Sequence, residues 1–381
     1  MGFKQLEPAY GFDDVSISPG IETINPDMTD LSFSIGENTE HKFEIPFIAS
    51  AMDAVVDPNF ASSMTKYGGL GVMNMDGIHI RYEELEQVYE DIINAPKDKA
   101  TQIMQKIYSK PIDKNLISKR IEDAKKNGGI VAVSFVPQTA KRHAPIAVEA
   151  GADIVVVQGT VVTARHSSKS LEGLILSKLK KELDVPIIVG NTVSYDVTKE
   201  LMDENIDGIL VGVGPGSVCT SREVLGIGIP QITATIECAA ARDDYYKDNG
   251  RYIPIITDGG IRTGGDICKS FAAGTDAVMI GSPFAKCKEA PAKGFHWGMA
   301  TWHDSLPRGI RIKLGTEYSL EELLFGPSSR TDGTLNLVGA LRVCMGYVGA
   351  RNLKEMNKAK MVYAPAIKTE GKIYQSAGLG S

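Results

Sequence analysis

The sequence of 381 residues lacks the cysteine patterns of secreted and metal-binding proteins. It has five cysteines, an odd number, and none of them forms a Cys-x-x-Cys motif or is paired with histidine at metal-binding spacing. Widely spaced cysteines of this kind indicate neither a disulfide framework nor a zinc site. We therefore expect a reduced, cytoplasmic protein.

Long apolar runs and clustered charge are also missing. No stretch approaches the ~18 consecutive apolar residues of a membrane helix, and the first residues lack the apolar region of a secretion signal. Lysine and arginine are scattered along a chain whose formal net charge is −6. Neither nucleic acid nor a membrane is therefore an expected partner, and a small anionic ligand would need a local site.

What the chain does have is eight short apolar runs, each followed by a segment with helical spacing. Runs that are continuously apolar fit strands buried on both faces, and the intervening helices require parallel crossovers. Eight such units fit a (β/α)8 or TIM barrel better than an open doubly wound sheet. We therefore expect one α/β domain that comprises residues 1–381. The runs span residues 45–50, 69–73, 129–135, 153–159, 186–191, 208–214, 254–260 and 277–282.

Two segments exceed a minimal barrel. Residues 81–127 are charged and helix-prone, which predicts a helical insertion between the second and third strands. Residues 283–335 are rich in glycine, proline and aromatic residues and follow the eighth strand. A long excursion at the catalytic rim of a barrel is typical of a lid or flap.

The ends of the seventh and eighth runs suggest a nucleotide. They read Asp258-Gly259-Gly260 and Gly281-Ser282, at the place where barrels often bind phosphate through backbone N–H groups. Tight turns that need glycine are the alternative. A carboxylate such as Asp258 suits the paired hydroxyls of a ribose, and phosphate with ribose indicates a nucleotide.

The sixth run leads into the loop GVGPGSVCTSREVLGIG, residues 212–228, which contains Cys219. A single cysteine is most often a small buried apolar residue. On a glycine-rich loop at the catalytic rim, however, it is placed to attack an electrophilic carbon. We therefore favour Cys219 as a nucleophile and interpret the other four cysteines as structural.

This loop resembles the catalytic-loop signature of the IMP dehydrogenase and GMP reductase family, and further segments similar to the family follow in the family's order. The resemblance implies the barrel fold inferred above and a homotetramer or octamer. The segments are FDDV (12–15), IASAMDAV (48–55), GGLGVM (68–73), VGN (189–191), TDGGIRTGGDICKSFAAGTDAVMIGS (257–282), GM (298–299) and LVGALRVCMGYVGA (337–350).

The resemblance also implies roles for individual residues. Cys219 would attack C2 of IMP, hydride would pass to NAD, and water would release XMP. Ser221 stands where the family has a threonine, and the carbonyls of Gly214, Gly216 and Cys219 match those that hold a potassium ion. The positions expected to contact the nucleotide are Ser50, Met52, Asn191, Ser217, Asp258, Gly259, Gly260, Gly281, Ser282 and Met299.

Three departures from the family pattern bear on function. Residues 81–127 are too few for the regulatory pair of CBS motifs found in large dehydrogenases, so feedback through such a module is not expected. Gln158 stands where an aspartate meets the nicotinamide ribose, and Gly159 and Thr160 complete the expected cofactor site. The family's flap arginine, its water-activating base, has no clear counterpart, so Arg308 and Arg311 are the candidates, with a solvated or phosphate-binding pair as the alternative.

The flap sequence separates the possible activities. Reductases of the family typically read GMSSE after the eighth strand, whereas this chain reads GMATW, with Trp302 in place of the glutamate. We therefore favour an IMP dehydrogenase without CBS motifs. A GMP reductase, which the chain length also suits, and a purine-sensing barrel without catalysis remain the alternatives. His296 and Trp297 in the same segment either stack on a base or pack internally.

Overall fold

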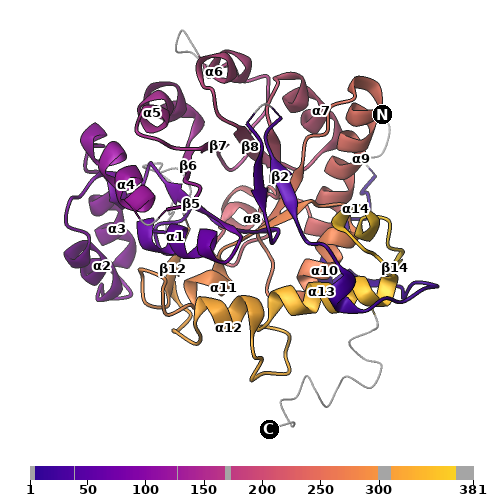
Figure 1. The fold of residues 1–381 in the computed structure, drawn as a ribbon. Coiled ribbons are helices and arrows are strands. Elements are labelled where there is room, and N and C mark those ends of the chain that lie inside the picture. Colours follow the sequence, from indigo (N-terminus) through magenta and orange to yellow (C-terminus); the bar gives the residue numbers. More distant parts are fainter. Residues whose placement is uncertain (1–4, 38, 127, 168–172, 299–309, 366–381) are drawn as a thin grey trace.

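The computed structural model describes residues 5–37, 39–126, 128–167, 173–298 and 310–365, and its centre is a closed barrel of eight parallel strands (Figure 1). Each predicted run overlaps one barrel strand, so the predicted TIM barrel is confirmed. β11 closes the barrel by pairing with β4, with Val278 opposite Phe47. The strands are β4 (Phe47–Ala49), β5 (Leu70–Asn74), β6 (Ala132–Phe135), β7 (Ile154–Gln158), β8 (Ile187–Thr192), β9 (Gly208–Val211), β10 (Ile255–Asp258) and β11 (Ala277–Ile280).

Helices surround the barrel and explain why its strands are apolar throughout. Each strand packs one face into the barrel interior and the other against the helices, so no face is left for water. Nearly all barrel-strand residues are fully buried. The surrounding helices are α1 (Pro58–Lys66), α4 (Lys114–Lys126), α5 (Pro137–Glu149), α6 (Leu176–Glu182), α7 (Tyr195–Asp203), α9 (Gln231–Asn249), α10 (Gly264–Ala272) and α13 (Leu337–Val348).

Three aspartates repeat the same contact where every second strand begins. Each aspartate lies directly before a strand. Its carboxylate accepts one hydrogen bond from the backbone N–H at the start of the neighbouring strand and a second from a lysine or arginine side chain. Bonds of this kind satisfy a carboxylate that is removed from water. The sets are Asp153 with Val131 N and Lys125 (2.7 and 2.6 Å), Asp207 with Ile187 N and Lys180 (2.8 and 2.6 Å), and Asp276 with Ile255 N and Arg242 (2.8 and 2.8 Å).

Further elements close the ends of the barrel. A hairpin of β2 (Phe33–Ile35) and β3 (His41–Phe43) lies at the amino ends of the strands, where Glu37 accepts a hydrogen bond from Arg251. β1 (Val15–Ile17) pairs with β14 (Met361–Tyr363). The remaining short elements are η1 (Phe12–Asp14), η2 (Pro26–Met28), η3 (Ile78–Ile80), α8 (Ser221–Leu225), α11 (Ser282–Ala285), α12 (Leu320–Phe325) and α14 (Leu353–Met356).

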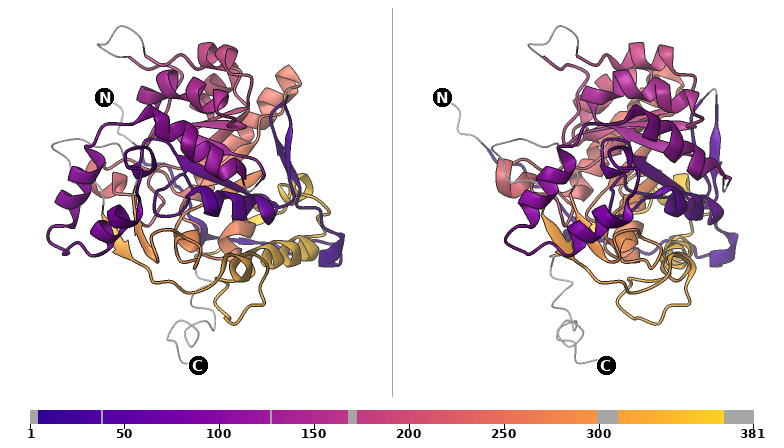
Figure 2. Two further views of the ribbon diagram at one scale, coloured as in Figure 1. Left: turned by 60° about the vertical axis from the view of Figure 1, so that its left-hand side comes forward. Right: turned by 90° about the vertical axis from the view of Figure 1, so that its left-hand side faces the viewer.

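The two predicted additions to the barrel lie side by side. In residues 81–127, α4 packs between α1 and α5 as a regular barrel helix, so only α2 (Glu86–Ile93) and α3 (Ala100–Tyr108) exceed a minimal barrel. The excursion after β11 forms a two-stranded sheet of β12 (Phe295–Trp297) and β13 (Arg311–Lys313). All views show this sheet beside α2 and α3 (Figures 1 and 2).

None of the helices within the described ranges is both long enough and apolar enough to cross a bilayer.

The buried pair of Asp276 and Arg242 gives a test of the aspartate contacts. Replacing Asp276 by Ala leaves the guanidinium of Arg242, whose side chain is 3% exposed, without its buried partner. We expect the free energy of unfolding to fall by about 3–5 kcal/mol, measured by urea denaturation. The control is Asp243→Ala, because Asp243 pairs with the same arginine but is 66% exposed and should cost under about 1 kcal/mol. Equal losses would contradict this account.

Candidate active site

The carboxyl ends of the barrel strands surround a cavity of about 890 Å³. Every strand contributes at least one lining residue, either its last residues or the residue that follows. This is the end at which barrel enzymes have their active sites. The contributing residues, in strand order, are Ser50, Asn74, Ser134, Gln158, Asn191, Gly212, Asp258 and Gly281.

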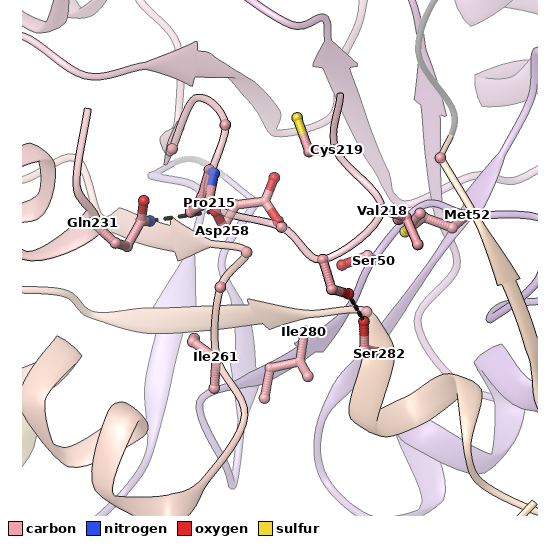
Figure 3. Close-up of a pocket in the computed structure, with 18 of the residues that line it drawn as sticks. Ser50, Met52, Pro215, Val218, Cys219, Gln231, Asp258, Ile261, Ile280 and Ser282 are labelled. Atoms are coloured by element: carbon pink, nitrogen blue, oxygen red, sulfur yellow. Dashed lines mark hydrogen bonds between the residues drawn. The ribbon is translucent and has the colours of Figure 1, made fainter. Parts of the chain in front are cut away.

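Cys219 lies on the loop after β9 and lines this cavity (Figure 3). The loop begins at Gly212, where a Cβ atom would come within 2.2 Å of the Asp258 carbonyl oxygen, so only glycine fits. Cys219 N–H donates to the Gly216 carbonyl at 3.1 Å and closes the turn. The thiol, half-buried, lies 3.4 Å from the hydroxyl of Ser221, the first residue of α8. The fold thus presents the predicted nucleophile to the cavity with a hydroxyl beside it.

Asp258 ends β10 inside the same cavity (Figure 3). Its Oδ2 accepts hydrogen bonds from Asn191 Nδ2 and Gln158 Nε2, both at 2.9 Å. Burial raises the pKa of the carboxyl to about 6, and the two amide bonds, which lower it, offset burial only in part. The described side chains bond only Oδ2, which leaves Oδ1 to accept hydrogen bonds from a ligand.

Gln158 belongs to this carboxylate network. Besides Asp258, its Nε2 contacts Asn191 Oδ1 at 3.2 Å. The amide therefore orients two predicted nucleotide contacts. Gly159 and Thr160, the other two predicted cofactor contacts, line both the main cavity and a second one of about 290 Å³ beside it.

Hydroxyls and glycines form another side of the cavity. Ser217 Oγ, on the loop after β9, lies 2.6 Å from Ser282 Oγ, at the start of α11. Figure 3 shows Ser282 at this side of the cavity. Ser50, Met52, Gly259 and Gly260 line the same cavity. Small side chains and hydroxyl donors leave room for a phosphate and can bond to its oxygens.

Two predicted residues, Met299 and Arg308, lie outside the described residues. Arg311 is described, and it is not among the residues that line the cavity. Its guanidinium donates to the carbonyls of Ile92, Ile93 and Ala95 at the end of α2, at 2.7 Å for Ile93 and 2.8 Å for Ala95. The unpaired carbonyls at a helix C-terminus attract a cation. In this structure Arg311 attaches β13 to the insertion, so the fold does not bring this predicted catalytic base to the cavity.

Two cavity residues had weaker sequence signals. Gln231, at the start of α9, donates to the Val211 and Asp258 carbonyls at 2.6 and 3.3 Å and joins the ends of β9 and β10. His296, which the sequence left open between stacking and packing, lines the cavity from β12. Its burial lowers the pKa to about 4, so the imidazole is neutral at pH 7. The available sequence signals were positional: Gln231 follows the loop that carries Cys219, and His296 lies in the excursion after the eighth strand.

No cluster of histidine, cysteine, aspartate or glutamate suited to a metal ion occurs in the part of the chain that the structure describes. Any metal at this site would need backbone or hydroxyl oxygens. The carbonyls of Gly214, Gly216 and Cys219 are the predicted donors, and such hard oxygens are what potassium takes.

The fold and the site define an α/β-barrel protein with a cysteine-bearing cavity at its catalytic rim. The family model for the IMP dehydrogenase / GMP reductase domain matches residues 9–302. The chain therefore belongs to this family of oxidoreductases.

Individual relatives agree with that assignment. An uncharacterized oxidoreductase of Mycolicibacterium smegmatis is 38% identical over 92% of this chain and 95% of its own. The inosine-5'-monophosphate dehydrogenase of Cryptosporidium parvum is 30% identical over 94% of this chain and 92% of its own. The solved structure of an IMP dehydrogenase/GMP reductase-like protein from Corynebacterium glutamicum superposes on this chain with a TM-score of 0.88 and 34% sequence identity. The match covers 95% of this chain and 96% of that one.

The raised pKa of Asp258 predicts a pH-dependent affinity for purine nucleotides. If the carboxyl contacts the ribose as predicted, its ionised form accepts the hydroxyl hydrogen bonds more strongly than the neutral acid does. Affinity for IMP or GMP should then fall as the pH drops through about 6, by up to about tenfold per pH unit below that. Calorimetric titration between pH 5 and 8 measures this dissociation constant.

The control is Asp258→Asn, because the nucleotide's own phosphate titrates in the same range. This variant should bind weakly at every pH and retain only the phosphate's pH dependence. Identical pH profiles for the two proteins would contradict the assigned role.

Proposed function

We propose that the protein is an IMP dehydrogenase that oxidises IMP to XMP with NAD through a covalent intermediate on Cys219. The observation that carries the proposal is the presence of the Cys219 thiol, the Asp258 carboxyl and the serine hydroxyls around one cavity. The family membership and the named dehydrogenase relatives support the same activity.

Binding would orient the nucleotide between the two sides of the cavity. Ser217, Ser282 and the glycines near them would hold the phosphate, and Asp258 Oδ1 would accept from the ribose hydroxyls. The purine would then extend toward the loop after β9, with C2 facing Cys219. Positioning of this kind converts the reaction with the thiol into an effectively intramolecular step.

The chemistry would begin with attack of Cys219 Sγ on C2, which forms the S–C2 bond. NAD, when bound, accepts the hydride that leaves C2. Water then adds to the resulting thioimidate, and the C2–S bond breaks to release XMP and the free thiol. Ser221 Oγ, at 3.4 Å from Sγ, would orient the thiol.

The second cavity supports a place for the dinucleotide. It adjoins the main cavity at Gly159 and Thr160 and is lined by the partly exposed apolar side chains of Val161, Leu225 and Ile227. An apolar shelf beside backbone polar groups suits a flat heterocycle with a few directional contacts. We therefore propose that NAD would lie along these residues.

Potassium and assembly are further parts of the proposal. The carbonyls of Gly214, Gly216 and Cys219 would hold the ion and thereby the cysteine loop. The Gly216 carbonyl already accepts the Cys219 N–H, and its second lone pair is available to a cation. We propose a cytoplasmic homotetramer, with an octamer as the alternative assembly.

One observation favours GMP reductase as a second candidate. Hydrolysis of the thioimidate needs a base. Of the two candidate arginines the structure describes Arg311 alone, and this side chain is bonded to the end of α2 instead of lining the cavity. A reductase removes ammonia from GMP and transfers hydride from NADPH, so it needs no such hydrolysis.

Replacement of Cys219 by Ala should abolish turnover and leave nucleotide binding within about threefold, because the nucleophile is lost while the polar contacts remain. Steady-state rates and calorimetric titration with IMP measure the two effects. Cys344→Ala is the matched control, because Cys344 is also half-buried but does not line the cavity. Turnover by the Cys219 variant would falsify the covalent mechanism.

Paired assays decide between the activities. Absorbance at the reduced-nicotinamide band is followed with IMP, NAD and a potassium salt, and in parallel with GMP and NADPH. We expect reduction of NAD in the first assay alone. Oxidation in the second alone would make the protein a GMP reductase, and no change in either would favour the purine-sensing barrel.

A further inference from the structure

The insertion of α2 and α3 forms a small hydrophobic cluster of its own, separate from the barrel core, and a flap residue completes it. Trp297 of β12 is fully buried there, with its ring 6.4 Å from that of Tyr89. The other members come from the insertion, the loop after β4, η3 and the segment before β12. The cluster consists of Ala54, Ile78, Val88, Tyr89, Ile92, Met104, Ile107, Ala292 and Trp297.

A chain of hydrogen bonds fixes Trp297 in this cluster. Trp297 Nε1 donates to Tyr108 Oη at 2.8 Å, and Tyr108 Oη donates to Asp53 Oδ2 at 2.7 Å. Burial raises the pKa of Tyr108, which keeps the hydroxyl protonated and able to donate. Asp53 is fully buried and also accepts from Asn74 Nδ2 and Ile78 N, at 3.0 and 2.8 Å.

Asp53 connects this chain to the cavity from one side. It follows Met52, which lines the cavity in the loop after β4. Asn74, its amide donor, ends β5 and lines the cavity as well. The carboxylate therefore joins the insertion to two strand ends at the site.

β12 makes the second connection, through the alternation of its side chains. Successive residues of a strand point to opposite faces, so the strand that buries Trp297 in the insertion directs His296 into the cavity. β13 holds the same strand from the other side, with Arg311 opposite Trp297 and bonded to the end of α2. Both strands of the sheet are thus attached to the insertion.

His296 brings an unpaired ring nitrogen to the cavity wall, as far as the described residues show. It is 1% exposed, and its buried Nδ1 has no hydrogen-bond partner among the described residues. Its Nε2 lies close to Gly281, because a Cβ added to that glycine would be 3.5 Å from this nitrogen. Gly281 precedes Ser282, whose hydroxyl contacts that of Ser217. A buried polar atom of this kind gains free energy from a ligand that bonds to the ring.

We propose that the α2–α3 insertion is a positioning element of the nucleotide site: Tyr108 and Trp297 hold β12 so that His296 contacts the phosphate end of the nucleotide. The inference rests on the proposed nucleotide site and not on which reaction follows. His296 touches the ligand, whereas Tyr108 and Trp297 act through it.

Tyr108→Phe tests this proposal in the full-length protein. The variant removes the acceptor of Trp297 Nε1 and a donor to Asp53, and we expect the dissociation constant for IMP or GMP to rise about tenfold, the effect of one buried hydrogen bond. Binding of inosine, which has no phosphate, should stay within about twofold. The measurement is calorimetric titration, so it needs no turnover.

Tyr82→Phe is the matched control. Tyr82 packs beside the same insertion and its hydroxyl donates to the Ile107 carbonyl at 3.1 Å, but it has no bond to Trp297 or Asp53. The control should unfold at a temperature close to that of Tyr108→Phe and bind nucleotide like the wild type. If both variants lost the same affinity for the nucleotide, Tyr108 would only stabilise the fold, and the proposal would be overturned.

His296→Ala supplies the second test and does not depend on the insertion's stability. It should weaken nucleotide binding about tenfold, and adding Tyr108→Phe should weaken it by less than about twofold more, because coupled residues are not additive. Full additivity would overturn the proposal. A wild type that binds neither IMP nor GMP would reject the nucleotide site itself, whereas tight binding with unaffected variants would reject only the positioning role.

Discussion

The parallel pairing of β11 with β4 closes the sheet, and the rest of the site depends on that closure. Ser50 N–H, just after β4, donates to the carbonyl of Ile280, the last residue of β11, at 2.9 Å, so the carboxyl ends of the first and last barrel strands meet directly. Because all eight strands run in one direction, their carboxyl ends converge on one rim. Cys219, Asp258 and Ser282, which are far apart in the sequence, share a cavity for this reason.

Carboxylates at the two ends of the barrel have different hydrogen-bond partners. At the amino ends, Asp207 and Asp276 each accept a backbone N–H and a bond from a basic side chain of opposite charge. At the carboxyl end, the described side chains give Asp258 two amide donors, both on one oxygen, and its pKa is raised. An incompletely satisfied carboxylate costs stability in the free protein, and a ligand that supplies the missing donors recovers that free energy.

Much of this arrangement could be predicted from the sequence because strands buried on both faces leave continuous apolar runs. The same order of strands located Cys219 and Asp258 at the rim. Arg311 could not be placed in this way, since its partners are carbonyls at the end of α2 and no sequence pattern announces a contact between such distant segments. The bounds of the insertion were also too wide: residues 114–126 are as charged as those before them, yet they form a barrel helix. The aspartates before β7, β9 and β11 recur at the same place relative to an apolar run, so their shared contact could also have been predicted.

The location of the insertion explains why it can influence the site at all. A loop that follows a barrel strand emerges at the carboxyl end, so helices inserted after β5 must lie at the same rim as the cavity. The excursion after β11 emerges there too, and the apolar faces of both need cover. They cover each other, with Trp297 as the shared side chain. A two-residue alternation in β12 then suffices to couple that packing to the cavity, because a shift that moved Trp297 out of its cluster would also move His296 away from Gly281.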